Sequence, residues 1–107
     1  MAGIEDRGKA NENKFAHDSE LEFKANARRN KLVGQWAAKL MGLEGEAVDA
    51  YAKEVIVADL EEKGDDDVFR KLRRDFDAKN IEMSDHRIRR EMDDLMAVAR
   101  DQVRNEA

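Results

Sequence analysis

Residues 19–42 read SELEFKANARRNKLVGQWAAKLMG, and this stretch decides the fold class. Ser19 and Glu22 have the spacing of a capping box, in which both side chains bond free amides at a helix start. Apolar residues then recur at helical spacing, and Gly42 suits the left-handed residue that ends many helices. We therefore predict a helix from Ser19 to Gly42. The side chains expected in the core are Leu21, Ala25, Leu32, Trp36 and Leu40.

Three more helical segments follow, separated by glycine and short polar residues. The second begins around Gly45 and is expected to stop at Gly64, and Asp65 is expected to cap the third. Asn80 suits the turn after the third segment, and Ser84 suits the cap of the fourth. These signals predict an all-α fold, an antiparallel four-helix bundle with short connections. The core positions are Val48, Tyr51, Ala52, Val55, Ile56, Phe69, Leu72, Phe76, Ile88, Met92, Leu95, Ala99 and Val103.

The composition narrows the range of partners. The chain has 107 residues, which suits one domain, and its 20 basic and 25 acidic side chains give a net charge of −5. This balance argues against nucleic acid as a partner and against binding to anionic membranes. The chain lacks cysteine, so it has no disulfide or thiolate chemistry. Every long apolar run is interrupted by polar residues, so direct membrane insertion is not expected.

The residues of the chain do not form a recognisable catalytic set, so we do not expect an enzyme. The only histidines are His17 and His86. Each has an aspartate beside it, but no Glu-x-x-His or His-x-x-x-His pattern places metal ligands on one helical face. No metal or cofactor site is therefore predicted. Two basic clusters could grip phosphate, but solvated helix faces are the simpler interpretation. The clusters are Arg28, Arg29 and Lys31, and Arg87, Arg89 and Arg90.

The segment before Ser19 is polar and cannot cover a core. Between Ile4 and Asp18 the apolar side chains are Ile4, Ala10, Phe15 and Ala16. Such a segment is either a disordered tail or an arm that folds on a partner, because its apolar surface cannot offset the cost of ordering it. We therefore divide the chain into a flexible N-terminal arm, residues 1–18, and a bundle, residues 19–107.

Four stretches carry a resemblance to a known family. They are KFAHDSELEFKA (14–25), ARRNKLVGQWAA (27–38), AYAKEV (50–55) and DVFRKLRRD (67–75). Together with the sequence around them, they closely resemble the bacterial ATPase inhibitor subunit zeta family over nearly the whole chain. The resemblance implies a four-helix fold with a mobile inhibitory arm. It also implies that the arm inserts, as a helix, at a catalytic alpha–beta interface of the F-type ATP synthase near the gamma subunit and blocks hydrolytic rotation.

The resemblance also assigns residues in the arm. Ile4 stands where the family usually has an aromatic residue, and Gly8 where it often has glutamate; both departures weaken an inhibitory helix. The residues expected to bind the partner are Ile4, Asp6, Arg7, Lys9, Ala10, Glu12, Lys14, Phe15 and Ala16.

The resemblance further implies partners and a location. The expected partners are the alpha, beta and gamma subunits of the synthase, and the free protein is expected to be a monomer. Its expected place is the cytoplasm, peripheral to the inner membrane through the synthase. No cofactor is expected, although weak association with nucleotide stays open. The alternative functions are a stand-alone four-helix adaptor and a weak nucleotide-binding protein.

Overall fold

The computed structural model describes the backbone of residues 2–60 and 65–106, and the side chains of 19–60 and 65–106. Within these ranges the chain is all-α, with four helices and no strand. The predicted fold class is confirmed. The helices are α1 (Ala2–Leu40), α2 (Glu46–Ala58), α3 (Asp66–Ala78) and α4 (Asp85–Glu106).

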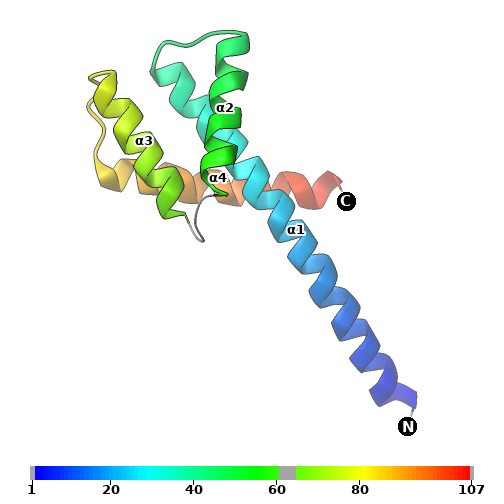
Figure 1. The fold of residues 1–107 in the computed structure, drawn as a ribbon. Coiled ribbons are helices and arrows are strands. Elements are labelled where there is room, and N and C mark those ends of the chain that lie inside the picture. Colours follow the sequence, from blue (N-terminus) through cyan, green and yellow to red (C-terminus); the bar gives the residue numbers. More distant parts are fainter. Residues whose placement is uncertain (1, 61–64, 107) are drawn as a thin grey trace.

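The helices form a small bundle from which one end of α1 projects. The C-terminal half of α1 packs against α2 and α4, and α3 packs against these two helices on the other side (Figure 1). The N-terminal half of α1 extends away from the other helices, which makes the molecule 65 Å long but only about 25 Å wide (Figure 1). Residues 2–18 of the predicted arm fall in this projecting segment.

The predicted start of the first helix at Ser19 is wrong, because α1 begins at Ala2. The residues before Ser19 contain no proline, and eight of the 18 are alanine, glutamate, lysine or arginine, which favour a helix. A capping box sets a helix start only where the preceding chain leaves the helix, and here the chain does not. The proposed boundary at residue 18 therefore falls inside one continuous helix, and the division into arm and bundle stays a prediction.

The core contains most of the side chains predicted for the last three helices. Trp36 packs edge-to-face on Phe76, with ring centroids 5.7 Å apart, which confirms a packing role for Trp36. The prediction for α1 is partly wrong, since Leu40 is 45% exposed. The core cluster of buried residues is Val33, Ala37, Ala38, Tyr51, Val55, Val68, Leu72, Phe76, Ile88 and Met92.

The face of α1 that enters the core is lined by small residues, which explains this error. Val33, Ala37 and Ala38 are fully buried there, whereas the prediction followed the larger Leu32 and Leu40. Small residues let two helices approach closely. A Cβ atom added to Gly34 would lie 2.5 Å from Cα of Ala52 on α2, so the α1–α2 contact requires glycine.

The predicted helix ends are mostly confirmed. Gly42 and Asn80 have φ angles of 82° and 57°, the left-handed conformation expected after a helix. The Ser84 hydroxyl accepts a hydrogen bond from the backbone amide of Arg87 at 3.1 Å, as an N-cap should. α2 ends earlier than predicted, and the predicted stop at Gly64 lies outside the described residues.

Candidate functional site

The predicted arm residues, from Ile4 to Ala16, all fall on the projecting half of α1 (Figure 1). Their backbone is helical, and their side chains lie outside the described residues. The structure thus places these residues on one continuous element that faces away from the bundle. Which of the side chains bind a partner stays a prediction.

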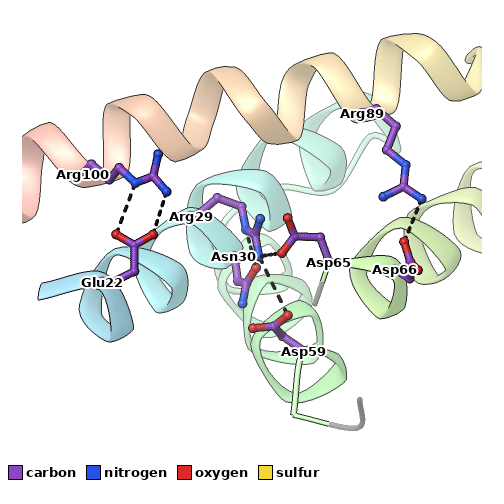
Figure 2. Close-up of polar contacts among 8 residues, drawn as sticks. All are labelled: Glu22, Arg29, Asn30, Asp59, Asp65, Asp66, Arg89 and Arg100. Carbon is purple, nitrogen blue, oxygen red and sulfur yellow. Dashed lines mark hydrogen bonds and ion pairs between the residues drawn. The ribbon is translucent and has the colours of Figure 1, made fainter. Parts of the chain in front are cut away.

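One ion pair ties α1 to α4 just after the arm. Arg100 on α4 donates through Nη2 to Oε1 of Glu22 at 2.6 Å and through Nε to Oε2 at 3.3 Å (Figure 2). The hydrogen bond to Glu22 raises the pKa of Arg100 above its ordinary value. A two-point contact of this kind fixes the relative orientation of the two helices as well as their distance. Glu22 therefore serves α4 here and does not cap a helix.

A second pair lies farther along the same two helices. Arg28 donates to Glu106 at 2.8 Å and to Gln102 at 3.0 Å. The hydrogen bond from Arg28 lowers the pKa of Glu106, so this contact is present at neutral pH and is lost as pH falls through that lowered pKa. Both pairs are partly exposed and contribute little stability each. Their role is to hold the end of α4 along the base of the arm.

Arg29 is buried, which contradicts the prediction of a solvated basic face. Its side chain is only 2% exposed, and its Nε donates to Oδ1 of Asn30 at 2.7 Å. Its Nη2 donates to Asp65 at 2.9 Å and lies 3.8 Å from Asp59 (Figure 2). Asp65 precedes α3 but makes no side-chain cap, because its carboxylate binds Arg29. Arg29 thus joins α1 to the end of α2 and the start of α3.

Replacing Arg29 should destabilise the bundle more than replacing its neighbour Arg28. We expect Arg29→Ala to lower the free energy of unfolding by about 2–4 kcal/mol, because the packing of a buried side chain and a half-buried ion pair are lost together. Arg29→Met keeps most of the packing and should cost clearly less, and the partly exposed control Arg28→Ala should cost less than about 1 kcal/mol. Urea unfolding measures all three. Equal losses for alanine and methionine at position 29 would refute packing as the larger contribution.

The second basic cluster is a charged surface, as predicted. Arg89 on α4 donates to Asp66 on α3 at 3.0 Å (Figure 2). Its guanidinium also lies over the ring of Phe69, 4.1 Å from the ring centroid. Arg87 pairs with Glu91 at 3.6 Å, one turn along α4. These contacts link α3 to α4 and stabilise the surface of the bundle. In these contacts Arg87 and Arg89 are each paired with a carboxylate of the chain itself.

A polar cluster between α2 and α3 was not predicted. The Tyr51 hydroxyl donates to Asp75 at 2.7 Å, and Lys71 donates to the same carboxylate at 3.0 Å. Burial and the bond to Asp75 raise the pKa of Tyr51 above its usual range, so the hydroxyl stays protonated. All partners are satisfied within the cluster, which makes it a structural contact.

Among the described residues, no group of His, Cys, Asp and Glu is placed to hold a metal ion.

Known proteins are similar to this chain in sequence and in fold. The family profile described as ATPase inhibitor subunit zeta matches residues 1–102. The chain belongs to the ATPase inhibitor subunit zeta family. A solution NMR structure of a protein with 45% sequence identity is similar to this chain, with a TM-score of 0.72. The match covers 81% of this chain and 99% of the other. No curated protein matches the chain.

Membership of the zeta family gives the chain a regulatory role. The family is one of ATPase inhibitor subunits, which indicates a regulatory, non-catalytic protein. The match includes the arm as well as the bundle, because it begins at residue 1. Among the residues that the structure describes, no helix combines the length and the apolar composition that crossing a bilayer requires.

Proposed function

We propose that this chain inhibits ATP hydrolysis by the F-type ATP synthase, and that the first half of α1 is the inhibitory element. The arm inserts at a catalytic alpha–beta interface near the gamma subunit and blocks rotation in the hydrolytic direction. The proposed partners are accordingly the alpha, beta and gamma subunits. The free protein is a monomer on the cytoplasmic side, and no cofactor takes part.

The observation that carries this proposal is the projection of α1 from the bundle. The helix has 39 residues, so its axis is about 59 Å long, and its first 17 residues extend by roughly 26 Å. A single helix of this reach fits a crevice between two subunits. The bundle at the other end of α1 is wider than a single helix and stays outside the crevice, which limits how deeply the arm is inserted. The family match over the same residues supports an inhibitory use of the arm.

The arm is not self-sufficient as a helix, which suits a segment that orders on its partner. Its backbone extends away from the other helices (Figure 1), and Gly8 lies inside it at a cost of about 1 kcal/mol relative to alanine. Ile4 and Phe15 are separated by 11 residues, or about three turns, which places them on the same face of the helix. An alpha–beta interface can cover these two positions at once and thereby stabilise the arm.

The test is a titration of the purified chain against a purified F-type ATPase. ATP hydrolysis should fall to a low plateau as the chain is added, while ATP synthesis is affected less. Cross-linking from a photoreactive residue at position 12 should label alpha or beta. Hydrolysis that stays constant at a large excess of the chain would refute the proposal and favour an adaptor role.

Substitutions at Gly8 test whether the arm acts as a helix. Gly8→Glu removes a cost of about 1 kcal/mol and puts an acid near the positive end of the helix dipole, which adds ~0.3–1 kcal/mol. Inhibition should tighten by roughly five- to thirtyfold. Gly8→Pro should weaken it, because the proline ring clashes with the preceding turn. The measurement is the inhibition constant of each variant on the same enzyme.

Gly8→Ala is the matched control, since it changes the backbone preference without adding charge. None of the three variants should alter the melting temperature of the bundle. Equal inhibition constants for glycine, glutamate and proline at this position would mean that the arm does not bind as a helix through residue 8.

A further inference from the structure

Phe23 is exposed close to the point where the arm leaves the bundle. Its side chain is 72% exposed, whereas Phe76 and Tyr51 are buried. It follows Phe15 by eight residues, which is about 12 Å along α1. A single exposed apolar side chain is common and needs no explanation. What surrounds Phe23 therefore decides whether the position has a function.

Phe23 lines an apolar groove that three helices build together. Ala27 comes from α1, Ile56 from α2 and Val103 from α4, and the groove has a volume of about 320 Å³. It is open to solvent along one side of α1. Such a shape buries a few side chains of a protein surface better than it encloses a small molecule, which needs a pocket that covers most of its surface.

The rim of the groove on α1 is positive, although the whole chain has a charge of −5. Lys24, Arg28 and Lys31 border it, and Arg28 is neutralised by Glu106 at 2.7 Å. Lys24 pairs only weakly with Glu20, at 3.5 Å between two exposed side chains. Lys31 is exposed and makes no ion pair with any residue in 19–60 or 65–106. The complementary surface is apolar with carboxylates at its edge.

We propose that this groove, the stem groove (Phe23, Ala27, Ile56 and Val103 with Lys24 and Lys31), is a second docking surface for the ATPase head. It rests on the proposed function, because the occupant is an apolar, acid-rimmed patch of the alpha or beta subunit outside the crevice that takes the arm. Arm and groove share α1, because Phe23 follows Phe15 by eight residues on the same helix. Once the arm is inserted, the groove is held at the mouth of the crevice. Contacts made there act at high effective concentration and slow the release of the arm.

The experiment compares full-length variants on purified F-type ATPase. Phe23→Gln removes the exposed anchor, and Leu40→Gln is its control, because Leu40 is also exposed on α1 but lies at the opposite end of the bundle. Lys31→Glu reverses the rim charge, and Lys53→Glu makes the same change on α2, away from the groove. Inhibition constants, dissociation rates and their salt dependence are measured for all four variants and for the unchanged chain.

Phe23→Gln should weaken inhibition about tenfold through faster dissociation, as for a central interface anchor. Lys31→Glu should weaken it several-fold at low salt and less at high salt. The two controls should inhibit like the unchanged chain. If the unchanged chain inhibits and both groove variants inhibit equally well, the stem groove is not a docking surface, while the function of the arm stands. If Phe23→Gln instead abolishes self-association in sedimentation without affecting inhibition, the groove joins two copies of the chain and the proposal is refuted.

Discussion

Removing residues 1–18 is expected to abolish inhibition of ATP hydrolysis while leaving the melting temperature of the bundle nearly unchanged. The segment projects from the other helices, and the first buried core residue after it is Ala25. Losing the arm removes the inserted element, so the inhibition constant should rise by at least about a hundredfold. Ser19 becomes the first residue of the shortened chain, and its capping box with Glu22 can then begin the helix.

A control of equal length separates sequence from bulk. Residues 1–18 are replaced by a glycine- and serine-rich segment, which keeps the length but is flexible and carries none of the arm's side chains. This chain should also fail to inhibit. Inhibition by either variant at the concentration that suffices for the intact chain would show that the bundle is the inhibitory element. Thermal unfolding by circular dichroism verifies that both variants stay folded.

The fold was largely predictable because its signals are local. Ser84, Asn80 and Gly42 each mark a helix end through their own side chain or backbone preference, and the structure places them as expected. The apolar stripe of α4 has a clear helical period, and Ile88 and Val103 are buried as predicted. The predicted start of α1 at Ser19 was wrong for the same reason, because it relied on a local signal alone. A cap signal favours a helix start but does not create one within a good helix-forming sequence.

The environment of the arm was less predictable because it depends on contacts between distant residues. Glu22 and Arg100 are 78 positions apart, and no local pattern connects them. Arg29 lies in a run of polar residues. The carboxylates of Asp59, after α2, and Asp65, before α3, offset the cost of burying its charge. An amphipathic pattern assigns charged residues to solvent by default, so a buried arginine is the residue type that this method misplaces.

The close contact between α1 and α2 leads to the second large effect, at Gly34. Gly34→Ala should destabilise the bundle by about 1–3 kcal/mol, even though alanine favours a helix by roughly 1 kcal/mol. The added Cβ would lie 2.5 Å from Cα and 3.1 Å from Cβ of Ala52. Because the nearest atom belongs to the backbone of α2, the helices must separate. Gly34→Val should cost more, and the melting temperature should fall by on the order of 10 °C for each 2 kcal/mol.

Two further variants test whether the backbone contact is the cause. Gly8→Ala makes the same exchange in α1 where the helix projects from the bundle, and it should leave the melting temperature of the bundle unchanged. Ala52→Gly removes the Cβ atom of Ala52 but not its Cα, so combining it with Gly34→Ala should not restore stability. Full recovery in the double variant would mean that the methyl groups clash and that the helix axes need not move. Gly34 is remote from the arm. The Gly34→Ala variant should therefore inhibit ATP hydrolysis with an unchanged inhibition constant at temperatures where the bundle is folded.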